Sequence, residues 1–312
     1  MAVLEDVTSP PAAGLRPRGV SRRDRWQRRL PLLPALIYTI VVTQVPFLVT
    51  LWYSFQSYFW NEPGGAHWTG VSNYREVFTD PSFRSALWRS VTMTVIAVIL
   101  AMILGILLAV LLDKKFIGRG IVRTLLITPF LVMPAAAALV WAGPMLDPNF
   151  GLLNWLLEPF GVNHVAWLTT HAYGSVIVVM IWQWTPFMTL IVLAGLQGQA
   201  ADVLEAAKVD GASAWSTFRE LTLPHLRPYI ELGILLGTIY LVTAFDQVRL
   251  MTNGGPGTET TTLPFFLYQK VNYAFDVGGA AAAGVVTVLL TIIVASFALR
   301  MFARVFQFEE AR

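Results

Sequence analysis

Six long runs of apolar residues recur along this chain, and they constrain its fold more than any other feature. A helix needs roughly 20 consecutive apolar residues to cross the hydrocarbon core of a bilayer, which is about 30 Å thick. Because lipid offers no hydrogen-bond partners to free backbone groups, such runs must be helical where they cross. The sequence therefore predicts an all-α integral membrane protein with six transmembrane helices, at residues 30–55, 90–112, 124–142, 174–196, 229–250 and 279–299.

Charged residues are almost absent from these runs. Only the fifth run carries any, and they are Glu231, Asp246 and Arg249. Asp246 and Arg249 are three residues apart, which on a helix favours a structural ion pair. An ionisable residue inside a membrane can instead mark an ion pathway, so an ion-coupled secondary transporter or a channel for a small polar solute is the alternative function.

The basic residues predict the orientation of the chain in the cytoplasmic membrane of a prokaryote. Cytoplasmic loops carry an excess of Lys and Arg. All but five of the 22 Lys and Arg residues lie in segments that alternate onto one side, which places both termini in the cytoplasm. These residues are dispersed along loops and form no basic stripe with aromatic residues between, so no nucleic-acid partner is expected. The five residues on the outer side are Arg75, Arg84, Arg89, Arg249 and Lys270.

The charge pattern and the apolar runs also divide the chain into parts. A basic cytoplasmic tail precedes the first run, and anionic lipid headgroups are its expected contact. A first helix with its outer loop follows, then a membrane core, then a short cytoplasmic end. Three prolines interrupt two of the expected spans and favour kinks there, at Pro129, Pro134 and Pro186. The expected boundaries are 1–29, 30–88, 89–303 and 304–312, with a polar cytoplasmic loop at 197–228.

Catalytic and metal chemistry find little support in the sequence. The chain has no cysteine, which excludes disulfides, thiolate nucleophiles and Cys-ligated metals. No intramembrane Ser-His pair, paired Asp or metal cluster is visible, so the chain is not expected to be an enzyme. The histidines show no metal-binding spacing and are expected in loops or at interfaces; they are His67, His164, His171 and His225.

The polar loop contains the stretch EAAKVDGASAWSTFRELTLP, residues 205–224. Residues 202–209 can form a short helix, and Gly211 suits the left-handed geometry that ends a helix. Ser213 can cap a second helix, which Pro224 is expected to end. These features predict a helix-turn-helix knuckle on the cytoplasmic face. It is either a docking knob for another protein or a helix pair lying on lipid.

The residue order of this loop resembles the cytoplasmic EAA loop of permease subunits in ATP-binding-cassette importers. The resemblance is carried by Glu205-Ala206-Ala207, Gly211, Leu221, Leu223 and Pro224, with Leu221 where isoleucine is usual. Asp210, Ala212 and Phe218 resemble the form found in carbohydrate importers. Three further stretches resemble maltose-type and polyol-type permeases: GVSNY at 70–74, WTPF at 184–187 and LMTNGGPGTETTTL at 250–263.

This resemblance implies a type I importer permease fold and a set of partners. They are a second, homologous permease subunit, two copies of an ATPase subunit, an extracytoplasmic solute-binding protein and a sugar or polyol. ATP and Mg would be bound by the ATPase, because the chain has no phosphate-binding loop, and no cofactor is expected in the chain itself. Since the chain stops soon after Phe308, it resembles the first-type subunit of the heterodimeric pair. The implied ATPase-coupling residues are Glu205, Ala206, Ala207, Asp210, Gly211, Ala212, Phe218 and Pro224.

The resemblance also implies a solute pathway midway through the bilayer, on the helices before and after the EAA loop. Sugars and polyols suit such a surface, because their C–H faces pack on aromatic rings while their hydroxyls bind polar side chains. The asparagine-rich wall of a maltodextrin site is missing from the fifth run, which argues against maltose itself. The matching positions are Gln183, Trp184, Phe187, Gly237, Tyr240, Leu241, Thr243 and Ala244.

Overall fold

The computed structural model describes residues 33–162 and 164–310. The expected basic tail at 1–29 lies outside the described residues. The chain divides into two compact units, Met1–Val49 and Thr50–Arg312, and each is described by itself. The first unit contributes most of helix α2 (Leu33–Tyr53), whose 21 residues carry no charge.

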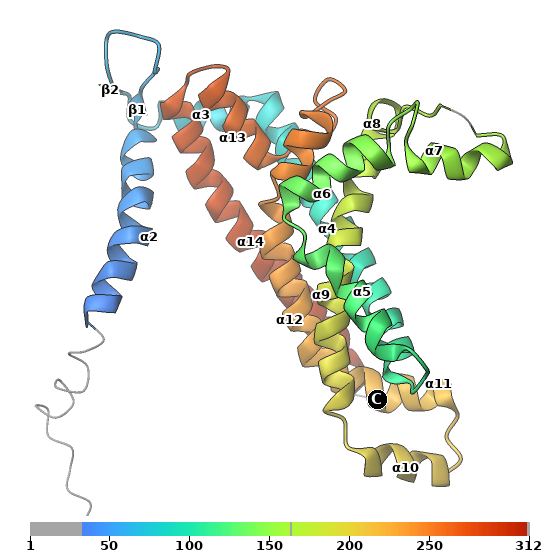
Figure 1. The fold of residues 1–312 in the computed structure, drawn as a ribbon. Helices are drawn as coiled ribbons and strands as arrows, with labels where there is room; N and C mark the ends of the chain where they lie inside the picture. Colours follow the sequence, from blue (N-terminus) through green and yellow to red (C-terminus); the bar gives the residue numbers. More distant parts are fainter. Residues whose placement is uncertain (1–32, 163, 311–312) are drawn as a thin grey trace, which may run out of the picture. The chain divides into compact units, whose positions relative to one another are not determined.

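Four long helices form the core of the second unit, α4 (Pro81–Asp113), α9 (Ala172–Gln197), α12 (Leu223–Val242) and α14 (Val277–Glu310) (Figure 1). The most extensive pairing is α4 against α9. Gly105 of α4 allows this approach, because a Cβ there would lie 2.6 Å from the Cβ of Met188 in α9. Small residues at such crossings are the usual means by which membrane helices pack closely.

The expected third span is not a single helix. It consists of α5 (Arg119–Leu131), then α6 (Pro134–Val140) continuing into a π-helical turn, η2 (Trp141–Met145), and the two parts are bent by 99°. Val132 and Met133 are extended at the break, and Pro134 opens α6. A proline disfavours helical geometry in the residue before it and has no N–H to donate, so the break falls at Pro134. Pro129 and Pro186 lie inside the helices α5 and α9.

The fifth expected span, 229–250, is also wrong in its extent. Helix α12 begins at Leu223 and ends at Val242. Residues 243–245 are not helical, and helical backbone resumes at Asp246 and runs into a π-helical turn, η5 (Val248–Thr252).

The count of six spans is only partly reproduced. Within the described residues, four helices are long and apolar enough to cross a membrane: α2, α4, α9 and the first 21 residues of α14. The bent α5 and α6 pair would make a fifth. Helix α12 is outside this set, and Arg227 and Glu231 place an ion pair of 2.9 Å in its first half.

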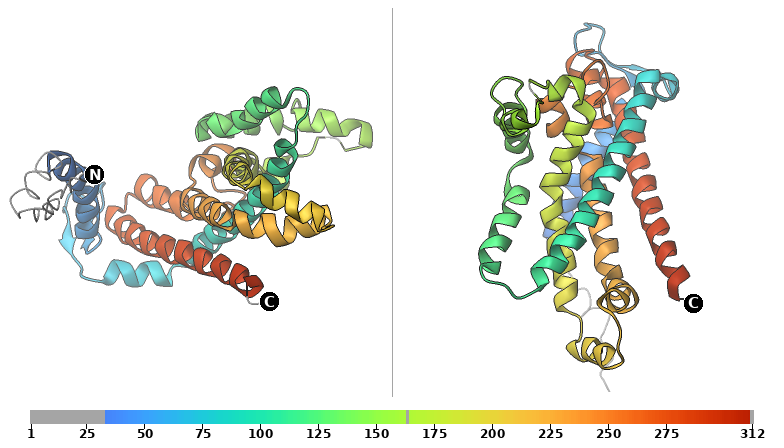
Figure 2. Two further views of the ribbon diagram at one scale, coloured as in Figure 1. Left: turned by 90° about the horizontal axis from the view of Figure 1, so that it is seen from below. Right: turned by 90° about the vertical axis from the view of Figure 1, so that its right-hand side faces the viewer.

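The short elements of the second unit gather at two opposite ends of the long helices (Figures 1 and 2). One end holds α10 (Ala201–Val209), α11 (Ala214–Thr217) and η4 (Phe218–Thr222), together with the last turn of α14. The other end, here called the outer end, holds β1 (Gln56–Ser57), β2 (His67–Trp68), α3 (Ser72–Thr79), α7 (Leu152–Leu157), η3 (Glu158–Phe160), α8 (Trp167–Thr170) and α13 (Leu263–Asn272).

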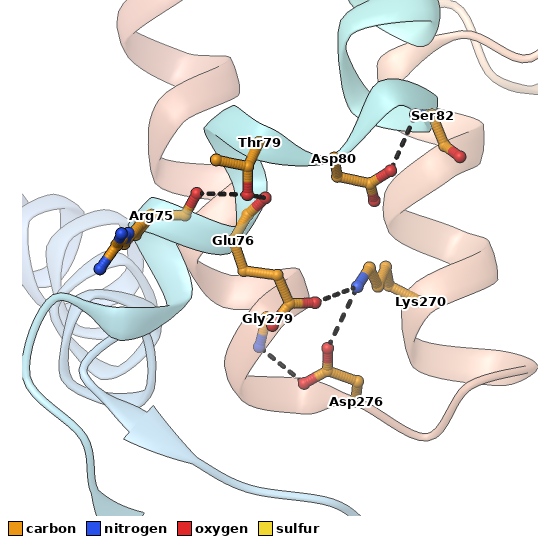
Figure 3. Close-up of polar contacts among 8 residues, drawn as sticks. All are labelled: Arg75, Glu76, Thr79, Asp80, Ser82, Lys270, Asp276 and Gly279. Atoms are coloured by element: carbon orange, nitrogen blue, oxygen red, sulfur yellow. Dashed lines mark hydrogen bonds and ion pairs between the residues drawn. The ribbon is translucent and has the colours of Figure 1, made fainter.

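A partly exposed polar joint holds the outer end together (Figure 3). The ammonium of Lys270 in α13 donates to Glu76 of α3 at 3.1 Å and to Asp276 at 3.5 Å. The other carboxylate oxygen of Asp276 accepts from the backbone N–H of Gly279 at 2.7 Å, which caps the first turn of α14. Burial of Lys270 works to lower its pKa, but the hydrogen bond and charge of Glu76, followed by Asp276, outweigh it and raise the pKa above its ordinary value.

The motif GVSNY belongs to the same end and has a structural explanation. The buried amide of Asn73 donates to the carbonyl oxygens of Ser54 and Gln56, at 3.0 and 2.8 Å. The hydroxyl of Tyr74 bonds that of Ser54 at 2.6 Å. This motif therefore satisfies backbone groups where the chain leaves α2 for the hairpin of β1 and β2.

Candidate functional site

The knuckle predicted at 205–224 forms at the end of the bundle. Helix α10 ends in a Schellman turn, in which Ala212 N–H donates to Ala207 O at 2.9 Å and Gly211 N–H to Lys208 O at 3.1 Å. Gly211 has φ of +80°, as the sequence predicted. The Ser213 side chain accepts from Ser216 N–H at 3.1 Å and caps α11, which confirms the second cap.

The surface of this knuckle combines charge with exposed apolar side chains. Glu205, Ala206 and Asp210 are exposed, whereas Ala207 is buried. Val209 is 87% exposed and Trp215 is 70% exposed, and the half-buried ring of Phe218 stacks on Trp215 at 5.9 Å. Large apolar side chains this exposed, beside charges, are typical of a protein-binding surface.

Pro224 does not end the second helix, contrary to the sequence-based prediction. It is the second residue of α12, and the π-helical turn η4 lies directly before that helix. Helical backbone therefore runs from α11 through η4 into α12 without interruption, from Ala214 to Val242. The knuckle is joined directly to the helix that carries half of the predicted solute pathway.

An aromatic cluster marks the middle of the bundle. Trp184 and Phe187 of α9 pack edge to face at 5.5 Å, and Trp184 also meets Tyr240 of α12 at 5.4 Å. Phe130, near the end of α5, stacks on Phe187 at 5.0 Å and was not among the residues selected from the sequence. The sequence feature that could have identified Phe130 was its position shortly before Pro134, where the span breaks. We call these four residues the aromatic wall; Tyr240 is exposed and the other three are half-buried.

The remaining predicted pathway residues do not share one surface. Leu241 and Gly237 face the protein core, and a Cβ on Gly237 would lie 2.5 Å from the Met188 side chain. Thr243 is exposed and Ala244 half-buried, both at the break that follows α12. Gln183 is only 3% exposed, and both the nitrogen and the oxygen of its side-chain amide form hydrogen bonds. The geometry thus groups Trp184, Phe187 and Tyr240 and separates Gln183, Gly237 and Leu241 from them.

The ion pair expected between Asp246 and Arg249 is not formed. Arg249 instead donates to the side-chain oxygen of Asn253 at 2.8 Å, and its guanidinium lies 5.2 Å from the ring centre of Tyr268. Asp246 and Arg249 both follow the break, and the π-helical turn η5 has more residues per turn than the α-helix on whose spacing the expected pair was based.

Metal-binding geometry is not found in the part of the chain that the structure describes. Across residues 33–162 and 164–310, no three His, Asp or Glu side chains lie close enough to hold a metal ion.

Comparisons with known proteins identify the family. Residues 115–307 match the family described as binding-protein-dependent transport system inner membrane component. The chain is 38% identical to a probable ABC transporter permease protein, y4oQ of Sinorhizobium fredii, over 85% of this chain and 86% of that protein. It is 32% identical to the trehalose/maltose transport system permease protein MalF of Thermococcus litoralis, over 84% of this chain and 89% of that protein.

A third relative and a solved structure extend these matches. The sulfoquinovosyl glycerol transport system permease protein SmoG of Agrobacterium fabrum is 33% identical, over 89% of this chain and 91% of that protein. A bacterial ABC transporter that imports the polysaccharide alginate contains a chain of the same fold, with a TM-score of 0.76, 22% identity, and coverage of 90% of this chain and 96% of that one. The chain therefore belongs to the family of binding-protein-dependent transport system inner membrane components, the permeases of ABC importers.

Proposed function

We propose that this chain is the permease subunit of an importer for a sugar or polyol, driven by ATP hydrolysis in a separate ATPase subunit. The observation that carries the proposal is the knuckle, which projects from one end of the bundle and is continuous with α12 (Figure 1). ATP and Mg would be bound by the ATPase, and this chain would perform no catalysis.

The chemistry of the knuckle favours a protein partner over a lipid surface. Its first helix and turn carry Asp202, Glu205 and Asp210 against a single basic residue, Lys208. The cytoplasmic leaflet is anionic, so this net negative charge would be repelled at a membrane surface. Beside those acids, the apolar side chains of Val209 and Trp215 offer anchors for a cleft in another protein.

Two of the three helices that carry the aromatic wall lead to the knuckle. Helix α9 carries Trp184 and Phe187 and ends at Gln197, a few residues before α10 begins. Helix α12 carries Tyr240 and continues from η4 without a break. A displacement of the knuckle by a partner would therefore be passed to both sides of the wall, which is the mechanical requirement for coupling hydrolysis to passage.

The substrate class follows from the wall and from the relatives. The partly exposed aromatic rings of the wall suit the C–H faces of sugars and polyols. The backbone break at Thr243 and Ala244 lies beside Tyr240 and leaves polar groups near the rings. Two relatives are named as permeases for trehalose/maltose and for sulfoquinovosyl glycerol, which supports a carbohydrate-like solute here.

The proposed assembly contains a second, homologous permease, two ATPase subunits and an extracytoplasmic solute-binding protein. A solved alginate importer of the same fold is in complex with a solute-bound periplasmic protein. The outer end of this chain would face such a protein, and the knuckle and both termini would lie in the cytoplasm. The basic side chains near the knuckle end support that orientation by the positive-inside rule; they include Lys114, Lys115, Arg119 and Arg123.

Reversing one charge tests the docking role. In a strain that co-expresses the neighbouring transporter genes, Glu205→Lys is expected to reduce both solute uptake and the ATPase recovered by pull-down, at matched membrane expression. Glu62→Lys makes the same charge change on an exposed residue of the outer end and is expected to leave the pull-down unchanged. If Glu205→Lys left both measurements normal, the knuckle would not be the ATPase contact.

A further inference from the structure

The break in the third span places the backbone carbonyl of Val132 outside the helical hydrogen-bond pattern. Helix α5 ends at Leu131, and the first backbone bond at the start of α6 runs from Ala137 N–H to Met133 O. The carbonyl of Val132 is part of neither the backbone hydrogen bonds of α5 nor those of α6. The side-chain amide of Gln183, on α9, donates to this oxygen at 2.9 Å. Inside a membrane an unpaired carbonyl is strongly unfavourable, so this bond makes the break tolerable.

The same amide also reaches the break in the fifth span. The side-chain oxygen of Gln183 accepts a hydrogen bond of 2.8 Å from the amide nitrogen of Gln247. Gln247 lies just after the non-helical residues 243–245 and just before η5. Gln183 and Gln247 are each 3% exposed. One chain of two bonds, from Val132 through Gln183 to Gln247, thus connects the two breaks across the unbroken helix α9.

The aromatic wall is built on the residues that border this chain of bonds. Trp184 follows Gln183 directly, Phe130 lies two residues before Val132, and Tyr240 lies three residues before the second break. The segments beyond the breaks also pack on each other, since η5 contacts both α6 and η2. The relative placement of the breaks therefore determines how the rings of the wall face one another.

We propose that Gln183 and Gln247 are positioning residues: their buried amides clasp the break of the third span to the break of the fifth and so set the geometry of the aromatic wall. Gln183 on this view binds backbone and Gln247, and not the solute. Only the assignment of the wall to a solute rests on the function proposed above.

A distance measurement without any solute distinguishes a clasp from a solute contact. Because the chain has no cysteine, spin labels can be placed at single exposed positions. Val178 on α9 serves as the fixed reference, with a second label either at Leu139 in α6 or at Leu250 in η5; all three are exposed. Distances would be measured by pulsed electron paramagnetic resonance in the full complex in nanodiscs, with no sugar present.

Gln183→Met is expected to broaden both distance distributions, because it removes both bonds while nearly keeping side-chain volume. Gln247→Met removes one bond and is expected to broaden the Val178 to Leu250 distribution most. Thr185→Val is the matched control, since the buried Thr185 hydroxyl donates only within α9, to Ile181 O at 2.7 Å, and both distributions should stay narrow. In the Gln183→Met, Gln247→Met double variant, the broadening should not exceed that of Gln183→Met.

Unchanged distributions in both methionine variants would overturn the clasp. Whether the ATPase copurifies with the parent chain tests the proposed importer function separately from the clasp. If the ATPase binds the parent chain and hydrolyses ATP while Gln183→Met leaves the distances unchanged, the clasp alone is wrong. If no ATPase binds even the parent chain, the importer function is wrong, whereas broadening in Gln183→Met would still establish the clasp.

Discussion

Two glycines in this chain differ in what restricts them. Gly211 has a left-handed backbone, and nothing lies within 4 Å of where its Cβ would be, so only conformation restricts the position. Gly237 lies in helix α12, and a Cβ there would lie 2.5 Å from the terminal methyl group of Met188, a flexible side chain that would have to move. Sequence patterns predicted the first role from its place after a helix. Gly237 was placed on a solute wall by resemblance to known permeases, and such a resemblance does not tell which face of the helix meets a neighbour.

Substitutions at Gly211 should separate conformation from contact. Gly211→Val forces a β-branched side chain into left-handed geometry, where a residue other than glycine costs about 1–2 kcal/mol. Asparagine tolerates this region better, so Gly211→Asn is the matched control. We expect Gly211→Val to lower ATPase pull-down at equal expression and Gly211→Asn to retain most of it. Equal losses in the two variants would show that size at this surface matters more than backbone geometry.

The raised pKa of Lys270 gives the outer joint a defined pH dependence. A group whose pKa is raised by folding stabilises the fold fully below its unfolded pKa, about 10.4 for Lys, and loses that contribution as pH rises through the higher folded pKa. Partly exposed ion pairs contribute at most about 1 kcal/mol each, so the effect is modest.

Lys270→Met is therefore expected to lower the thermal unfolding temperature of the purified chain at neutral pH. The difference from the parent chain should persist to about pH 10 and shrink above it, in thermal scans over a series of buffers. Lys115→Met, at the opposite end of the bundle and in none of the observed ion pairs of the described residues, is the control. A difference that shrank already between neutral pH and about pH 9 would contradict a raised pKa.

At the scale of elements, apolar runs predicted where helices lie but not where they break. The runs at 90–112, 174–196 and 279–299 each fall inside one helix. The run at 124–142 does not, although its prolines were recognised. The sequence alone does not distinguish a proline within a helix from a proline that starts a new helix. Pro129 is of the first kind and Pro134 of the second.

The break after α12 could not be read from composition, because nothing between Leu241 and Val248 marks it. The residue that follows it, Gln247, is held by a side chain distant in sequence, that of Gln183, 64 residues before it. Gln183 was predicted as a solute-pathway residue, because its two hydrogen bonds are tertiary and invisible to local patterns. The knuckle, whose geometry depends on neighbours in sequence, was predicted in more detail.

The contact of α4 with α9 gives a prediction at the same scale. In Gly105→Ala the new Cβ would lie 2.6 Å from the Cβ of Met188 and 3.1 Å from its backbone carbon, which cannot move freely. Such overpacking typically costs about 1–3 kcal/mol. In the control Gly120→Ala, in α5, nothing lies within 4 Å, and the change should be neutral or slightly stabilising. Purification yield and thermal unfolding of the two variants would measure this, and a comparable loss in both would contradict close packing at Gly105.

At the scale of the whole molecule, the successive spans of the second unit alternate in direction when the bent α5 and α6 pair is counted as one, and its loops lie at two ends (Figures 1 and 2). The knuckle and the end of α14 share one end, and the hairpin, α7 and α13 share the other. Lys and Arg residues are more numerous at the knuckle end than at the outer end. If that end is cytoplasmic, an ATPase and a solute-binding protein would act on opposite ends of the same helices, which is the arrangement an importer requires.

Labelling of single cysteines in this cysteine-free chain tests that orientation. Val209→Cys lies on the knuckle and Phe160→Cys at the outer end, where the parent side chains are 87% and 81% exposed. A maleimide that cannot cross membranes is expected to label Phe160→Cys in cells whose inner membrane is intact, and Val209→Cys only in inverted vesicles or after lysis. The parent chain, having no thiol, should stay unlabelled in each case. Labelling of Val209→Cys from outside would place the knuckle opposite to any cytoplasmic ATPase, and both the coupling role and the positive-inside assignment would then fail together.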